Sequence, residues 1–297
     1  MDIGLFIQFL LPGVTTGCIY ALVALGFVLC ANVAGVVNFA QGEYVMLGGL
    51  MAAWMASLHM PFFLVLIVPI ITGGAVAMFQ EAVTLRPVRN AKPFIQITTT
   101  VGFAIVVRGI CLIAFGRDPL ALPGFTGDDV FDLFGATLPI QTLWVWGTMA
   151  VMLAALYWFL KYTDVGRAVR ACSINLQAAR LMGVNAERMR LVVFAVSGAG
   201  GALAGIVVTP IVLASWDAGI TYSLKGFVGA IVGGFRSPTQ AVLAGLGIGL
   251  LEAFSAGYVS SGWQDLIVYG VLLTYLLIKG GVFLAGRATL AAGQLER

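Results

Sequence analysis

Residues 17–49 read GCIYALVALGFVLCANVAGVVNFAQGEYVMLGG, and this stretch decides the fold class. Its first part is apolar and belongs to a segment, about 3–31, that is long enough to cross a hydrocarbon core of about 30 Å as a helix. The polar run NFAQGE then separates this segment from a shorter apolar piece, about 42–57, which is rich in small residues. Polar backbone at membrane depth is tolerated only inside protein or beside water. The stretch therefore predicts a transmembrane helix followed by a short helix that begins inside a helix bundle.

The composition of the whole chain supports the same interpretation. Of its 297 residues, 60% are hydrophobic and 10% are charged, whereas about 25% of the residues in a soluble domain are charged. The 38 glycines suit helices that pack closely in lipid. We therefore expect an all-α, polytopic transmembrane bundle made by a single transmembrane domain over residues 1–297. No basic region precedes the first apolar run, so we expect this run to remain as an anchor.

Apolar runs along the rest of the chain set the number of spans. A run of roughly 20 apolar residues suffices for one crossing. If both short pieces traverse the membrane, the chain crosses about nine times; if one is re-entrant, the count falls and the two chain ends share a side. We thus expect about eight to nine membrane segments, two of them short or broken. The long candidates are about 3–31, 62–84, 94–115, 141–160, 191–213, 239–257 and 264–284, and the short ones about 42–57 and 222–234.

Basic residues gather in two segments and in the C-terminal tail. The loop at 85–93 and the polar segment at 161–190 are basic, whereas the loop at 116–140 is acidic. Because basic loops stay in the cytoplasm, we expect both basic segments and the C-terminus inside, and the acidic loop and the N-terminus outside. The chain would then be a multi-pass protein of the cell inner membrane. Membrane orientation accounts for this positive charge, so we expect no nucleic-acid partner.

Motifs for catalysis and metal binding are missing from the sequence. No lysine directly follows a glycine, so the chain has no GxxxxGK[ST] loop for nucleotide phosphates. It also lacks HExxH and GxSxG, and its four cysteines have neither metal-ligand nor redox spacing. An intramembrane enzyme would need a nucleophile and a base, and no credible set is visible. We therefore expect a non-catalytic membrane protein without a metal site or a cofactor of its own.

The break in the membrane pattern carries three polar side chains, Asn38, Gln41 and Glu43. A broken helix exposes backbone groups and a helix N-terminus, which many transporters use to form polar sites within the membrane. One hypothesis is that these three residues line a substrate pathway. The alternative is that Glu43 caps its own helix at the cytoplasmic interface.

Two further charges, Arg108 and Glu252, lie deep in apolar spans. At a rise of about 1.5 Å per residue, Arg108 is roughly 21 Å and Glu252 roughly 20 Å from the inner ends of their spans. Unpaired charges at this depth are costly. We therefore expect the two residues to bond to each other or to face one polar cavity, and a structural ion pair is favoured over a substrate site.

Other charged residues lie nearer to the ends of spans. Glu81 comes shortly before Arg86 and Arg89, which indicates a salt bridge at the membrane interface. Asp217 and Lys225 flank the second short piece and are typical either of an outer vestibule or of an exposed loop.

The segment at 161–190 has room for structure outside the membrane. Residues from Ala168 to Met182 include good helix formers, and we expect a helix of about ten residues along the inner surface. Gly183 is placed as the stop of this helix, and Asn185 as the cap of the next one.

Residues 177–183, QAARLMG, resemble the Glu-Ala-Ala-x-x-x-Gly loop of ABC-importer permeases. Ala178, Ala179 and Gly183 match that loop, Gln177 replaces its glutamate, and the Ile-x-Leu-Pro that usually follows is not present. Residues 17–49, 81–89 and 166–184 resemble, in this order, three blocks of the branched-chain amino acid (Liv-type) ABC importer permeases. Gln41 stands where that family has a histidine.

The resemblance implies a permease subunit that works by alternating access with separate partners. These would be two ABC ATPase subunits that bind ATP and Mg, a second homologous permease or a second copy of this chain, an extracytoplasmic binding protein, and membrane lipid. The substrate would be a branched-chain or related amino acid, with urea, a short amide or another small acid as the alternative. The rival class is an ATP-independent carrier or channel. Contacts with the ATPase would come from Arg170, Asn175, Gln177, Ala178, Ala179 and Gly183.

Overall fold

A computed structural model describes residues 3–127, 129–133, 136–235 and 237–295. Apart from one antiparallel hairpin, the regular structure in this part of the chain is helical. The elements are α1 (Ile3–Ala34), α2 (Gln41–Ser57), α3 (Phe62–Phe79), the π-helix η1 (Gln80–Leu85), α4 (Pro93–Phe115), β1 (Val130–Leu133), β2 (Ala136–Pro139), α5 (Gln141–Tyr162), α6 (Asp164–Ile174), α7 (Leu176–Leu181), α8 (Ala186–Val208), α9 (Ala218–Val232), α10 (Pro238–Tyr258), the 3-10 helix η2 (Ser261–Trp263) and α11 (Gln264–Leu295).

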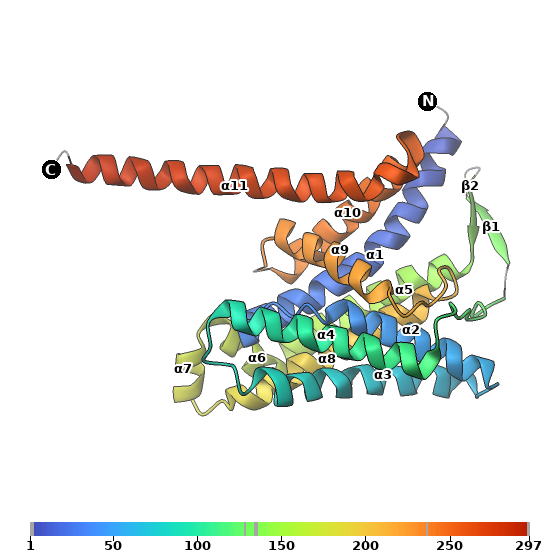
Figure 1. Cartoon of the computed structure of the whole chain (residues 1–297), viewed down its shortest axis with the longest axis horizontal. Coiled ribbons are helices and arrows are strands. Elements are labelled where there is room, and N and C mark those ends of the chain that lie inside the picture. Colours follow the sequence, from blue (N-terminus) through green and yellow to red (C-terminus); the bar gives the residue numbers. More distant parts are fainter. Residues whose placement is uncertain (1–2, 128, 134–135, 236, 296–297) are drawn as a thin grey trace.

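Seven segments of the described chain are helical, long and apolar enough to cross a membrane. Each overlaps one of the seven long candidates of the sequence, although the span expected at 191–213 lies five residues earlier, at Ala186–Val208. The two short helices are α2 and α9. The expectation of an all-α polytopic bundle is therefore confirmed. The β1–β2 hairpin, which lies in the acidic loop, was not expected. This hairpin and the α6–α7 pair lie at opposite ends of the bundle, called here the hairpin end and the α7 end (Figure 1).

Burial separates the helices of the core from those that face outward. Nearly every residue of α1 from Cys18 to Cys30 is buried, and α1 packs against α8, α9 and α10. By contrast, α4, α5 and α11 expose large apolar side chains such as Ile113, Val151 and Leu277. Water would penalise such a surface, whereas lipid solvates it. The helices around α1 are thus arranged as in a protein embedded in a bilayer.

Glycines bring α1 and α10 into backbone contact. A Cβ atom placed on Gly249 would lie 2.2 Å from the backbone nitrogen of Gly17, and one on Gly245 would lie 2.6 Å from that of Ala21. Small residues at a helix interface allow such close approach in membranes. This contact fixes the position of α10, which carries Glu252.

We expect Gly249→Ala to lower the free energy of unfolding by about 1–3 kcal/mol, because the added methyl group has no room. Gly247→Ala on the same helix is the matched control, since a Cβ atom there meets nothing within 4 Å. The unfolding midpoints of the two purified variants in detergent measure the difference. Equal midpoints would contradict the tight α1–α10 contact.

The two breaks in the membrane pattern meet inside the bundle. A Cβ atom on Gly42, the second residue of α2, would lie 2.1 Å from the carbonyl oxygen of Gly219 in the first turn of α9. The N–H of Gly42 donates to Ser223 Oγ at 2.8 Å, and the Ser223 hydroxyl donates to the carbonyl of Phe39 at 2.9 Å. The beginnings of the two short helices are therefore joined directly.

Candidate functional site

The break between α1 and α2 is held by a closed set of buried hydrogen bonds. Asn38 Nδ2 donates to the hydroxyl of Tyr44 at 3.2 Å, and Gln80 Nε2 donates to Asn38 Oδ1 at 2.8 Å. The Tyr44 hydroxyl in turn donates to Gln80 Oε1. Gln80 opens the π-helix η1, so this irregular turn at the end of α3 supplies the partner that the break needs. Buried polar groups satisfied in this way make the break a rigid feature.

Gln41 joins the same break to α8. Its Nε2 donates to the carbonyl of Ser197 at 3.1 Å, and the Ser197 hydroxyl donates to Gln41 Oε1 at 2.7 Å. Both Asn38 and Gln41 are fully buried. The structure thus gives these two residues a bracing role, and their assignment to a substrate pathway stays a prediction.

Glu43 forms an ion pair with Arg108 of α4. The Glu43 side chain is 1% exposed, and a Cβ atom on Gly219 would lie 2.1 Å from its Oε2. The carboxylate therefore lies against the first turn of α9, where the helix dipole favours a negative charge. Glu43 is thus not an interfacial cap of α2, which has no side-chain cap. Among the described residues, Glu43 Oε2 and Arg108 Nε have no hydrogen-bond partner.

Glu252 binds Lys225 of α9, with 2.6 Å between Oε1 and Nζ. Lys225 also binds Asp265 at the start of α11 at 3.0 Å, and it is only 4% exposed. The expected bond between Arg108 and Glu252 is therefore wrong. The expectation compared only the depths of the two residues in the membrane, and depth does not say in which direction a side chain points from its helix axis. In the structure α4 packs on α2, whereas α10 packs on α1, α9 and α11. The exposed-loop interpretation of Lys225 is wrong as well, because the residue lies inside a helix.

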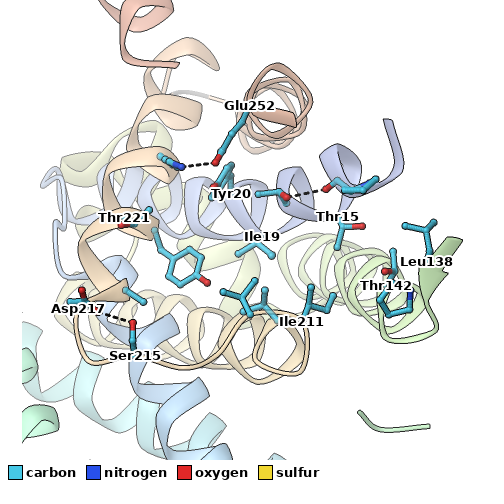
Figure 2. Close-up of a pocket in the computed structure, with 18 residues that line it drawn as sticks. Thr15, Ile19, Tyr20, Leu138, Thr142, Ile211, Ser215, Asp217, Thr221 and Glu252 are labelled. Atoms are coloured by element: carbon cyan, nitrogen blue, oxygen red, sulfur yellow. Dashed lines mark hydrogen bonds and ion pairs between the residues drawn. The ribbon is translucent and has the colours of Figure 1, made fainter. Parts of the chain in front are cut away.

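A cavity of about 570 Å³ lies beside this second ion pair (Figure 2). Glu252 and Tyr20 lie close together in the view, Ser215 and Asp217 lie at another side, Ile19 lies near the centre, and Ile211 lies below Ile19. The walls come from α1, α5, α8, α9 and α10, with β2 and the 211–217 connection. Arg108 and Glu43 line a separate cavity of about 370 Å³, so Arg108 and Glu252 do not face one shared cavity.

Three polar residues that line the 570 Å³ cavity have a regular spacing that can be seen in the sequence. Asp217, Thr221 and Lys225 follow one another at intervals of four residues, and all three line the cavity. Residues four apart lie on one face of a helix. This stripe was missed because Asp217 and Lys225 were considered as flanks of the short helix, whose beginning was expected four residues too late.

The segment between α5 and α8 forms two helices instead of one. Asn175 ends α6 and caps α7, because its Oδ1 accepts from the backbone nitrogens of Gln177 and Ala178, each at 3.0 Å. The expected helix stop at Gly183 is confirmed by its φ of 86°, and Asn185 caps α8 by accepting from the nitrogen of Arg188 at 3.1 Å. The single helix was wrong because the capping capacity of Asn175 outweighs the helix formers around it.

This helix pair presents an apolar surface at the end of the molecule. Ile174, Leu181 and Met182 are 82%, 88% and 85% exposed, and they are called the coupling tip below. Of the residues predicted to contact an ATPase, Ala179 is buried, whereas the others are exposed: Arg170, Asn175, Gln177, Ala178 and Gly183. The structure contains no ATPase, so their contact role stays a prediction.

Ion pairs join the start of α8, which follows the α6–α7 pair, to the loop that follows η1. Arg86 and Arg89 both bind the carboxylate of Glu187 in the first turn of α8. The expected salt bridge of Glu81 with these arginines is wrong, because Glu81 is buried and forms no ion pair within the described part of the chain. Glu187 takes its place because the start of α8 lies next to the 86–92 loop.

The chain is similar over nearly its whole length to known transport permeases. Residues 9–277 match the family model for the permease component of the branched-chain amino acid transport system. The chain is 31% identical over 293 residues to the high-affinity branched-chain amino acid transport system permease protein LivH of Salmonella typhimurium, covering 92% of this chain and 93% of the relative. It is 26% identical over 294 residues to BraD of Pseudomonas aeruginosa, a permease protein of the same description, covering 92% and 94%.

A solved structure shares the fold at low sequence identity. PsaBC from Streptococcus pneumoniae in complex with Fab superposes with a TM-score of 0.54 and 13% identity, covering 91% of each chain. The match to the family model extends over most of the chain and confirms the resemblance seen in the three sequence blocks. This multi-pass membrane protein therefore belongs to the family of branched-chain amino acid transport system permease components.

Proposed function

We propose that this chain is the membrane permease subunit of an ATP-driven importer, with ATP hydrolysis supplied by separate subunits and branched-chain or related amino acids as substrates. The coupling tip is the observation that supports it best. Three large apolar side chains more than four-fifths exposed, on a short helix pair outside the spans, are typical of a protein contact surface. The relatives LivH and BraD are named as branched-chain amino acid permeases, which supports the substrate class.

In this proposal the α7 end faces the cytoplasm, because it carries the basic segments. Two ABC ATPase subunits dock on the coupling tip and bind ATP and Mg, and this chain adds no cofactor. A second homologous permease, or a second copy of this chain, completes the membrane part in the inner membrane. An extracytoplasmic binding protein delivers the substrate at the hairpin end.

The connections of the coupling tip suggest how motion reaches the cavity. α6 follows α5 directly and α7 leads into α8, so a force on the tip acts on both long helices. Thr142 near the start of α5 and Val208 at the end of α8 both line the 570 Å³ cavity. A rigid movement of the tip would thus displace two walls of this cavity and open it to alternate sides. The substrate biases this change only through different affinities for the two states.

Purification of the tagged chain from its native membranes in mild detergent tests the proposal. We expect ABC ATPase subunits to co-purify, and the reconstituted complex with its binding protein to take up leucine only when ATP is supplied at the α7 end. Leucine uptake by the chain alone would overturn the proposal in favour of an ATP-independent carrier or channel. Uptake of urea or acetamide in place of leucine would retain the ATP-driven class and change the substrate.

A further inference from the structure

The charges around the 570 Å³ cavity do not balance. The charged residues in its described lining are Asp217, Lys225 and Glu252, of which two are acids. The single ammonium group of Lys225 is shared between Glu252 and a third acid, Asp265. The cavity therefore has an excess of negative charge when all of these groups are ionised. Such an excess attracts a cation, and it does so most strongly at Glu252, which is 13% exposed, because water screens the exposed carboxylates of Asp217 and Asp265.

The available oxygen atoms belong to the acids, since the base is already bonded. Lys225 is 4% exposed and donates to two carboxylates, and its ammonium group also lies 5.7 Å from the ring centre of Tyr20. Glu252 uses Oε1 for Lys225, whereas its Oε2 is buried and has no hydrogen-bond partner in the described chain. A buried carboxylate oxygen without a partner is energetically costly. A ligand that carries an ammonium group would supply the missing donor.

The second buried ion pair also leaves one carboxylate oxygen, Glu43 Oε2, without a hydrogen-bond partner in the described chain, but it lacks the excess of negative charge. Glu43 and Arg108 are one acid and one base, so their charges balance, and the carboxylate of Glu43 is packed against Gly219. The cavity beside that pair, about 370 Å³, is smaller. The excess charge therefore distinguishes the Glu252 cavity from it.

The remaining walls of the larger cavity are mostly apolar. Ile19, Val208, Ile211 and Val212 contribute aliphatic side chains, and Asp217 lies at the exposed rim. The volume is within the range of about 300–1,000 Å³ that is usual for small-molecule sites. Aliphatic walls around an acidic group suit a ligand with a branched or linear hydrocarbon body and a positively charged head.

We infer that this cavity binds the ammonium group of an aliphatic amino acid at Glu252, with the hydrocarbon side chain against the walls formed by Ile19, Ile211 and Val212. The inference rests on the proposed function and specifies its substrate class. It selects amino acids over urea and short amides, which have no ammonium group to donate a charged hydrogen bond to Glu252. It also gives Glu252 a role in binding beyond its ion pair with Lys225.

Binding of four matched probes to the purified complex, without binding protein or ATP, tests the inference by calorimetry. The probes are leucine, 3-methylbutylamine, 4-methylpentanoate and 4-methylpentanamide, which carry both charges, the ammonium alone, the carboxylate alone and no charge. We expect leucine and the amine to bind, and the carboxylate and the amide to bind at least about tenfold more weakly, as for the loss of one charge-assisted hydrogen bond. Binding of the amide as tight as that of the amine would overturn the inference.

Two variants connect this binding to the cavity, and a third is the control. Glu252→Gln should weaken the binding of 3-methylbutylamine by about ten- to a hundredfold. Ile211→Trp fills the cavity without changing an ion pair and should abolish the binding of 3-methylbutylamine. This second variant keeps the test decisive if Glu252→Gln fails to fold. Glu81→Gln changes another buried acid, outside the cavity lining, and should leave binding unchanged. Unchanged amine binding in Ile211→Trp would overturn the inference. ATP dependence of uptake is measured separately, so failure of the proposed function can be told from failure of this site.

Discussion

A double substitution of the coupling tip, Leu181→Asp with Met182→Asp, is expected to abolish ATP-driven uptake while the chain still folds. Both side chains are more than four-fifths exposed, so the substitutions remove few contacts within this chain. In an interface with an ATPase, however, two carboxylates would have to be stripped of water against an apolar surface, which is strongly unfavourable. Central apolar contacts dominate protein–protein affinity, so the loss should be on the order of a hundredfold or more.

Retention of the ATPase subunits during affinity purification measures this effect, and uptake by the reconstituted complex measures its consequence. Val130→Asp is the matched control, because Val130 is an exposed apolar residue on the hairpin, at the opposite end of the molecule. It should retain the ATPase subunits as the unchanged chain does. If the double variant also retained them and supported normal uptake, the coupling tip would not be the docking surface.

The features predicted well from the sequence were those that a few neighbouring residues determine. The lengths of the long spans follow from continuous apolar runs, and the break before Gln41 follows from the polar run at 38–43. Gly183 was identified as a helix stop because a glycine adopts its positive φ without strain, and Asn185 as a cap because its side chain can accept from a nearby backbone nitrogen. Such signals depend on local chemistry and do not need the tertiary arrangement.

The pairing of buried charges could not be predicted in the same way. Distance along a helix gives the depth of a residue, but its direction around the axis changes by about 100° at each position. Arg108 and Glu252 were matched by depth, whereas the structure pairs them with Glu43 and Lys225 on the two short helices. Those helices begin at the breaks and pack against each other through Gly42 and Gly219, a contact that no run of sequence reveals. The acidic cavity was missed for the same reason, since its walls come from five helices.

The two possible pairings of Arg108 make opposite predictions for double variants. Arg108→Met is expected to destabilise the protein by about 3–5 kcal/mol, because it leaves the carboxylate of Glu43 buried without a counter-charge. Adding Glu43→Gln should recover much of this loss, since the uncompensated charge is then removed. Adding Glu252→Gln should instead deepen the loss, because it leaves Lys225 with only the exposed Asp265. Unfolding midpoints in detergent for the single and double variants give both coupling energies.

The single and double variants form double-mutant cycles, in which two residues in direct contact give a different coupling energy from two residues that lie apart. Residues in one ion pair couple by about 0.5–3 kcal/mol, whereas distant residues add within about 0.5 kcal/mol. We therefore expect strong coupling between Arg108 and Glu43 and additivity between Arg108 and Glu252. Additivity between Arg108 and Glu43 together with strong coupling between Arg108 and Glu252 would mean that α4 and α10 meet within the bundle. The separation of the acidic cavity from the Glu43–Arg108 ion pair would then be wrong. Because both double variants share the same Arg108 substitution, a general loss of folding would lower both midpoints and could not produce the expected contrast.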